Sequence, residues 1–316
     1  MKHGRGRFIV GFLAPGLIVY TVFVLSPFVQ AFHYSLTNWT GVTPEFEYVG
    51  FANYQRLLED SVFKQALWNN AILLLVVPAV VVFLALMFAF LLNVGDSSGG
   101  GIRGIKGSGF YKLVFFMPQV LAIPVIAVIW AVILEPTKTG LANSLLLKID
   151  RVREWVFFGN DWFKIEPQRF LADPNLALWC VIWVLIWGSV GFYLVLFNAA
   201  ISSVPRDIFE AAVLDRASRL QTFLRITLPL LWDTVQTAWV YLAILALDAY
   251  ALVAVMTQGP GGPNNSTQVM SLQIAQNGFQ FGRAGYASAM GVVLFFLTMI
   301  IAVVMLRVSR RDRVEF

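Results

Sequence analysis

The chain has 316 residues, of which 58% are hydrophobic and 13% are charged, and its mean hydropathy is +0.72. A soluble globular domain carries about 25% charged residues, so this composition excludes an ordinary soluble enzyme or binding domain. The single cysteine, Cys180, excludes an intramolecular disulfide and a cysteine-cluster metal site, and two histidines, His3 and His33, argue against a histidine-built metal centre. The net charge of +5 comes from basic residues scattered among short loops, which indicates membrane orientation rather than nucleic-acid binding.

Six long apolar runs set the expected architecture. A bilayer core about 30 Å thick requires roughly 20 helical residues. The first run follows a basic head, but it is longer than the apolar core of a signal peptide, so we expect a span rather than a cleaved leader. The fold class that follows is an all-α membrane protein with one transmembrane domain over residues 1–316. Its six expected spans are 8–32, 70–93, 112–134, 178–201, 235–256 and 287–308.

The distribution of Lys and Arg predicts the orientation of these spans. Basic residues concentrate in the N-terminal segment, in the connection between the second and third spans, in that between the fourth and fifth, and after the sixth. The positive-inside rule therefore places both termini in the cytosol. The longest connection, residues 135–177, is then external, and its Trp and Phe residues suit either packing on the outer face or contact with an external partner.

Two connections have patterns of their own. Phe51–Asp60 (FANYQRLLED) has apolar residues at helical spacing, which predicts a short interfacial helix before the second span. Gly99–Gly109 (GGGIRGIKGSG) looks like a phosphate-binding loop, but Lys106 follows Ile105 and precedes Gly107, whereas a P-loop needs Gly-Lys followed by Ser or Thr. We interpret this stretch as a flexible cytosolic linker and expect no catalytic, cofactor-binding or metal-binding residues in the chain.

The segment 205–229, between the fourth and fifth spans, is too polar to cross a membrane and too periodic for a loop. Apolar residues recur at helical spacing on both sides of 216–218, which predicts two short amphipathic helices. Pro205 suits the start of the first helix, and Pro229 is expected to end the second. Such a helical hairpin on the cytosolic side presents a surface to another protein.

The spacing within this hairpin resembles a known signature. The inner-membrane permeases of binding-protein-dependent ABC importers carry Glu-Ala-Ala, three residues, Gly, nine residues, Ile, one residue and Leu-Pro. The resemblance implies a coupling helix that docks into a cleft of a cytosolic ATPase. It implies coupling roles for the matching positions and the tip, which are Glu210, Ala211, Ala212, Asp215, Arg216, Ala217, Ile226, Leu228 and Pro229.

Arg216 departs from that signature, because it stands where the family has glycine. A non-glycine residue in a left-handed turn costs roughly 1 kcal/mol. Either the turn is made differently, or Arg216 gains an acidic partner on the ATPase. We hypothesise the second, since the neighbouring Asp215 and Arg219 already make the tip charged.

Weaker motifs in the same order narrow the resemblance to the carbohydrate-uptake, MalF-like branch of these permeases: Phe51–Tyr54, Met117-Pro118, Gly140–Asn143 and Arg283–Ser288. The resemblance places the sugar-contacting positions of the branch on Gly188, Ser189, Phe192, Leu242, Leu245, Ala246 and Ala249. Asp248 is the one formal charge deep in an expected span, so it is a candidate proton or substrate site, with pairing across a subunit interface as the alternative. Whether this subunit or its partner contacts the substrate stays open.

The resemblance implies a permease subunit of an ATP-driven importer that translocates a sugar or oligosaccharide across the bacterial or archaeal cytoplasmic membrane. Its implied partners are a second homologous permease, two cytosolic ATPase subunits that bind ATP and Mg, an external solute-binding protein and membrane lipid. One alternative is an ion-coupled secondary transporter or channel, which calls for several intramembrane ionisable groups. Another is a membrane-embedded enzyme, which calls for clustered His, Asp or Glu.

Overall fold

The computed structural model describes residues 3–94, 107–137, 140–156, 166–257 and 261–308. This part of the chain is helical apart from loops and one isolated bridge between Thr37 and Tyr48. Contacts divide the chain into two compact units, residues 1–64 with 273–299, and residues 65–272 with 300–316. Most of the linker expected at 99–109, and the aromatic residues of the long connection at 157–163, lie outside the described residues.

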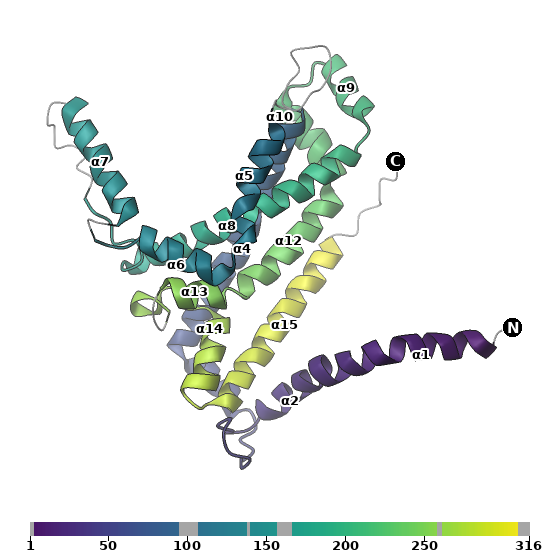
Figure 1. Ribbon diagram of the computed structural model, residues 1–316. Helices are drawn as coiled ribbons and strands as arrows, with labels where there is room; N and C mark the ends of the chain where they lie inside the picture. The colour runs from purple at the N-terminus through teal and green to yellow at the C-terminus, as the bar shows by residue number, and fades with distance from the viewer. Residues whose placement is uncertain (1–2, 95–106, 138–139, 157–165, 258–260, 309–316) are drawn as a thin grey trace. The chain divides into compact units, whose positions relative to one another are not determined.

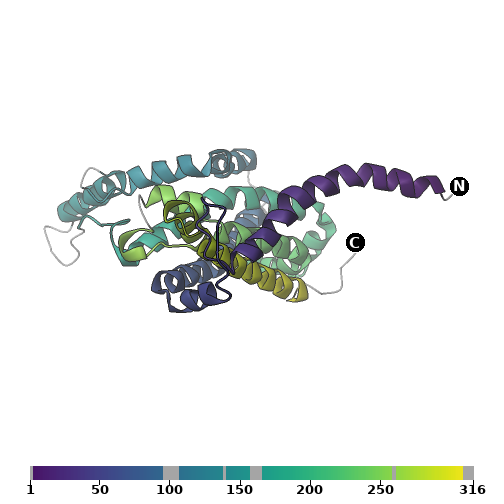
Figure 2. The ribbon, with the colours of Figure 1, turned by 90° about the horizontal axis from the view of Figure 1, so that it is seen from below.

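The first unit starts with a continuous helical rod, visible in purple in Figure 2. It consists of α1 (His3–Tyr20), the π-helical turn η1 (Thr21–Leu25) and α2 (Ser26–Tyr34). The expected helix before the second span is confirmed as α3 (Ala52–Glu59). The unit also contains the π-helical turn η5 (Gln276–Gln280) and most of α15 (Ala284–Val308). Aromatic rings join α2 to α15, because Phe28 and Phe32 lie 5.5 and 5.9 Å from Phe295 between ring centroids.

Two of the weak sequence motifs meet in this unit on the segment 35–39. The Asn53 Nδ2 group donates to the carbonyl oxygens of Ser35 and Thr37, both at 2.8 Å. The backbone N–H of Gly285 donates to the Trp39 carbonyl at 2.8 Å. A Cβ atom at Gly285 would lie 2.2 Å from the Thr37 oxygen, so only glycine permits this approach.

The second unit is built around α4 (Ser61–Val94), which starts in the first unit. Between Ala71 and Leu92 every residue of α4 is apolar, so burial rather than polarity distinguishes the faces of this part of the helix. The buried face repeats every four residues, while Leu75 and Phe83 on other faces are 65% and 56% exposed. The fully buried residues of the repeat are Leu73, Val77, Val81, Ala85 and Ala89.

The hydrophobic core of the second unit contains residues of α4, α6, α8, α12 and α13, whereas α7 extends away from α4 (Figure 1). After α4 the longest of these helices is α8, whose N-cap is the Asp173 side chain, which accepts from the Asn175 N–H at 2.8 Å. The helix α7 occupies part of the expected long connection, where no helix was anticipated. The bounds are α5 (Ser108–Val120), α6 (Ile123–Ile133), α7 (Leu141–Val156), α8 (Pro174–Ser203), α12 (Trp232–Leu247), α13 (Tyr250–Met256), the 3-10 turn η4 (Pro263–Asn265) and α14 (Met270–Ala275).

Four helical stretches are long and apolar enough to cross a membrane, and two bent pairs raise the number to six if each pair counts as one span. The third expected run bends by 99° between α5 and α6, where Leu121 and Ala122 are extended and Pro124 sits in the first turn of the new helix. The second bent pair joins Arg219–Leu230 to Trp232–Leu247. Apart from these two pairs, the fifth expected run is interrupted at Asp248 and Ala249, between α12 and α13. The third and fifth expected spans are therefore each made of two helices rather than one straight helix.

Candidate coupling segment and membrane pocket

The segment 205–229 starts where α8 ends. Pro205 is the N-cap residue of α9 (Arg206–Leu214), in agreement with its expected place at the helix start. Phe209 and Ala212 are buried, which fixes one face of α9 on the second unit. Figure 1 shows α9 and α10 at the end of this unit where α5 begins.

The turn after α9 contains a residue with unusual backbone geometry. Arg216 has φ of +54°, in the left-handed region that glycine adopts without cost. The Arg216 N–H donates to the Val213 carbonyl at 3.0 Å, and the Ala217 N–H donates to the Ala212 carbonyl at 2.9 Å. This pair of bonds is the Schellman pattern of helix C-termini. The turn therefore keeps the geometry of the glycine turn, although arginine supplies the residue.

The second half of the segment has its own caps. Ser218 and Gln221 form a capping box at the start of α10 (Arg219–Thr222), with reciprocal bonds of 2.8 and 3.3 Å between side chain and backbone. The chain continues through the π-helical turn η3 (Phe223–Thr227) and α11 (Leu228–Leu230). Pro229 lies inside α11, and the chain bends by 76° between Leu230 and Trp232 at the entry to α12.

Burial separates the predicted coupling residues into two groups. Phe223, which is 8% exposed, packs edge-on against Phe90 of α4 at 5.4 Å between ring centroids and anchors the segment. Ala212 is buried, and Ala217, Ile226 and Leu228 are half-buried. These four residues therefore face the protein interior rather than a partner. The exposed predicted residues are Glu210, Ala211, Asp215, Arg216 and Pro229.

Large apolar side chains lie exposed beside these polar groups. Leu214 is 84% exposed and Leu220 is 66% exposed, and Val213 and Leu224 are also exposed. An apolar patch rimmed by charges is typical of a surface that another protein covers. Among the described residues, no ion pair engages Arg216 or Glu210, so both charges are available to a partner.

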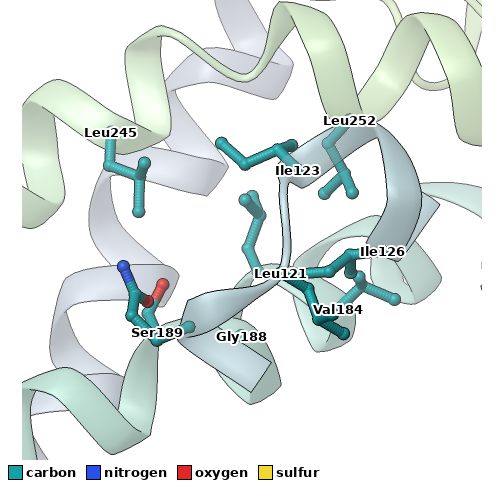
Figure 3. A pocket seen from close by; sticks show the side chains of 10 residues that line it. Leu121, Ile123, Ile126, Val184, Gly188, Ser189, Leu245 and Leu252 are labelled. Atoms are coloured by element: carbon teal, nitrogen blue, oxygen red, sulfur yellow. The ribbon is translucent and has the colours of Figure 1, made fainter. Parts of the chain in front are cut away.

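A pocket with an empty volume of about 440 Å³ lies between the α5–α6 break, α8, α12 and α13. Figure 3 shows Leu121, Ser189 and Leu245 around a common space. Gly188, Ser189 and Leu245 of the expected sugar-contacting set line it, together with Gln119. The pocket is largely apolar, and its polar side chains are the Ser189 hydroxyl and the Gln119 amide. The remaining lining residues are Ile123, Ile126, Val184, Leu185 and Leu252.

The structure separates the rest of the expected sugar-contacting set. Leu242, Ala246 and Ala249 are at most 3% exposed and belong to the hydrophobic core of the second unit, so they do not line this pocket. Phe192, which is 45% exposed, lies on the surface of α8. The expected set therefore contributes three lining residues, three core residues and one exposed ring.

Asp248 lies at the break between α12 and α13. Its φ and ψ angles are −98° and 43°, outside helical geometry, and its side chain is exposed. The residues that precede and follow it by about one turn, Leu245 and Leu252, both line the pocket. Within the described part of the chain, no side-chain hydrogen bond or ion pair is found for this carboxylate.

The sequence reading missed the contribution of the α5–α6 break. The bend between α5 and α6 brings three residues to the pocket: Gln119, Leu121 and Ile123. The nearby Pro118 and Pro124 are the sequence signals that could have revealed this bend. It also missed Gly191, at which a Cβ would lie 1.9 Å from the Phe115 carbonyl oxygen. That contact brings the backbones of α5 and α8 together.

Comparison with known proteins gives one family match. The sequence model described as "Binding-protein-dependent transport system inner membrane component" matches residues 49–314. This range includes α3 to α15 and thus both the segment 205–229 and the pocket.

Two curated relatives extend the match to nearly the whole chain. The permease protein NgcF of the diacetylchitobiose uptake system of Streptomyces coelicolor is 40% identical over 98% of this chain and 84% of its own length. The permease protein MsmF of the multiple sugar-binding transport system of Streptococcus mutans is 30% identical over 96% of this chain and 95% of its own. A bacterial alginate ABC transporter, solved with its periplasmic protein, contains a chain with the same fold, with a TM-score of 0.76, 22% identity and coverage of 98% and 96%.

Proposed function

Because the chain belongs to the family of binding-protein-dependent transport system inner membrane components, we propose that it is the permease subunit of an ATP-driven importer of a sugar or oligosaccharide. The protein is a multi-pass inner-membrane component. Its relatives are permeases of sugar uptake systems, which supports a carbohydrate substrate.

The observation that carries the coupling role is the exposed surface of the segment 205–229. Short amphipathic helices with exposed Leu214 and Leu220 need a protein partner to cover them. The exposed Glu210 carboxylate can make a charge-assisted hydrogen bond with that partner, and Ala211 permits close backbone approach. We assign the partner as a cytosolic ATPase subunit.

The complete importer would contain this chain, a second homologous permease, two ATPase subunits with ATP and Mg, and an external solute-binding protein. In this arrangement, six spans place both termini and the segment 205–229 in the cytosol, in agreement with the positive-inside rule. ATP binding would close the ATPase pair and draw the coupling segments together. The closure would open the membrane pocket toward the binding protein, and hydrolysis would reset the complex.

The relative with 40% identity is a permease protein of a diacetylchitobiose uptake system, so we propose an N-acetylated disaccharide as the first substrate to test. The binding protein sets the entry specificity in this arrangement, and the pocket at the α5–α6 break is the constriction through which the sugar passes. Because this pocket is mostly apolar, it suits the carbon face of a sugar ring better than its hydroxyl rim.

The test is the charge reversal Glu210→Arg in the importer co-expressed with its neighbouring subunits. We expect the ATPase subunit to be lost on purification and ATP-dependent uptake to fall to background, because a like charge replaces a docking carboxylate. The control is Glu166→Arg, an exposed acid outside the segment, which should retain the ATPase. Uptake that proceeds without any ATPase would contradict the proposal and favour an ion-coupled transporter.

A further inference from the structure

Asp248 carries an uncompensated charge in an apolar stretch. Between 235 and 256 it is the only acidic or basic residue, and a charge placed in a membrane span is energetically unfavourable unless water or a partner solvates it. Its carboxylate is exposed and no described side chain pairs with it. The cost is therefore not offset by a neighbour within the described chain.

The backbone around Asp248 is adapted to a polar environment. The helix α12 ends at Leu247 and α13 starts at Tyr250, so Asp248 and Ala249 are non-helical. Non-helical backbone at membrane depth is tolerated only where it is buried in protein or lines a water-filled cavity. Because an exposed carboxylate beside a non-helical backbone is unfavourable in lipid, we expect the break to face a water-filled cavity or an interface.

Neighbouring residues indicate the cavity. Leu245 and Leu252, on either side of Asp248, line the pocket that also contains Ser189 and Gln119 (Figure 3). Tyr241, two helical turns before Asp248, is 64% exposed. The Ser189 hydroxyl and the Gln119 amide line this pocket, and Asp248 is not itself a lining residue but stands in the chain between two residues that are.

We propose that Asp248 accepts hydrogen bonds from the hydroxyl and acetamido N–H groups of the sugar as it passes this pocket. An ionised carboxylate has two acceptor oxygens, so it can receive two adjacent donors of a sugar at once, and such charge-assisted bonds are about twice as strong as neutral ones. The inference rests on the proposed function and adds a charged contact, which the lining of the pocket lacks. It assigns substrate contact to this subunit.

The experiment compares Asp248→Leu, Asp248→Asn and the control Asp233→Asn, an exposed acid in the first turn of the same helix. Each variant is purified in the complete importer and reconstituted in liposomes with saturating binding protein. The probe is radiolabelled N,N′-diacetylchitobiose, and ATP hydrolysis and subunit composition are measured in parallel.

We expect Asp248→Leu to assemble normally and to lower the uptake rate by about tenfold or more, the loss of one charged hydrogen bond. Asp248→Asn retains an acceptor oxygen, so its uptake rate should lie between those of Asp248→Leu and the unmodified importer. The uptake rate of Asp233→Asn should equal that of the unmodified importer. Normal uptake by Asp248→Leu would overturn the inference. So would loss of the second permease from both Asp248 variants, because it would assign the carboxylate to an ion pair between subunits. An unmodified importer without ATP-dependent uptake of any tested sugar would overturn the proposed function as well.

Discussion

The hydroxyl of Tyr286 donates a hydrogen bond of 2.7 Å to Oδ2 of Asp60. The other carboxylate oxygen, Oδ1, accepts from the backbone N–H groups of Val62 and Phe63 at 2.8 and 3.1 Å. Asp60 therefore caps the first turn of α4 and fixes the start of α15 with the same side chain. The Arg56 guanidinium lies 4.8 Å from the centre of the Tyr286 ring and adds a cation–π contact.

The first prediction concerns this contact. Tyr286→Phe should lower the free energy of unfolding by about 1.5–3 kcal/mol, because the ring remains but the bond to a charged acceptor is lost. Thermal unfolding of the detergent-solubilised importer measures the change. The control is Tyr20→Phe, since Tyr20 is 53% exposed on α1. Equal thermal unfolding midpoints for the two variants would show that the hydrogen bond between Tyr286 and Asp60 does not contribute to stability.

The second prediction concerns the approach of α5 to α8. Gly191→Ala should destabilise the fold by about 1–3 kcal/mol or more, because the added methyl overlaps the Phe115 carbonyl and the backbones must move apart. Gly109→Ala, on α5, is the matched control, since nothing lies within 4 Å of the added atom. Yield of folded protein and thermal unfolding are the measurements. A Gly191→Ala variant as stable as the control would mean that the two helices separate without cost.

The third prediction distinguishes the two roles of Arg216. Arg216→Gly removes the charge and also the left-handed strain of roughly 1 kcal/mol, whereas Arg216→Ala removes the charge and keeps most of the strain. If Arg216 pairs with an acid on the ATPase, both variants should weaken ATPase retention and reduce its dependence on salt.

The measurements for Arg216 are ATPase co-purification at rising salt and ATP hydrolysis coupled to uptake. Arg216→Lys serves as the charge-preserving control and should remain close to the unmodified importer. Unchanged or improved coupling in Arg216→Gly would refute the acidic partner and leave only a strained turn.

The fourth prediction concerns a polar anchor in the second unit. The Asn69 side chain, which is 1% exposed, donates from Nδ2 to the carbonyl oxygens of Ser266 and Gln268 at 2.9 and 2.8 Å. Asn69→Leu leaves both buried carbonyls without this donor, at a cost of about 1–3 kcal/mol each. Amide hydrogen exchange at Thr267–Met270 should accelerate. Lys64→Leu, at an exposed position in the first turn of the same helix, should leave that exchange unchanged, and equal exchange rates in the two variants would show that the Asn69 hydrogen bonds do not hold this segment.

The sequence could predict the helical class and the two short helices within 205–229, because long apolar runs and helical spacing are local signals. The helix at Ala52–Glu59 was also predictable, since its apolar residues recur on one face. The motif spacing also located the turn between the two helices, because Arg216, at the position where the family has glycine, has the positive φ that glycine adopts easily.

The lining of the pocket could not be predicted, and the reason is physical. In an apolar span every face has similar hydrophobicity, so periodicity does not distinguish Leu242, which is fully buried, from its neighbour Tyr241, which is 64% exposed. The breaks at Leu121 and Asp248 then rotate the following helices to new faces. Burial therefore depends on bends that composition alone does not locate.

The course of α8 has a mechanical consequence. Its helical hydrogen bonds run without a break from Pro174 to Ser203, and Val204 and Pro205 connect it directly to α9. Ser189 is about 20 Å from that end, at 1.5 Å per residue. The close contact at Gly191 prevents α5 from sliding freely along it. α8 is therefore a stiff rod: a tilt at its Ser203 end would displace Ser189 and the Leu121 bend together, so the pocket would change shape as one piece.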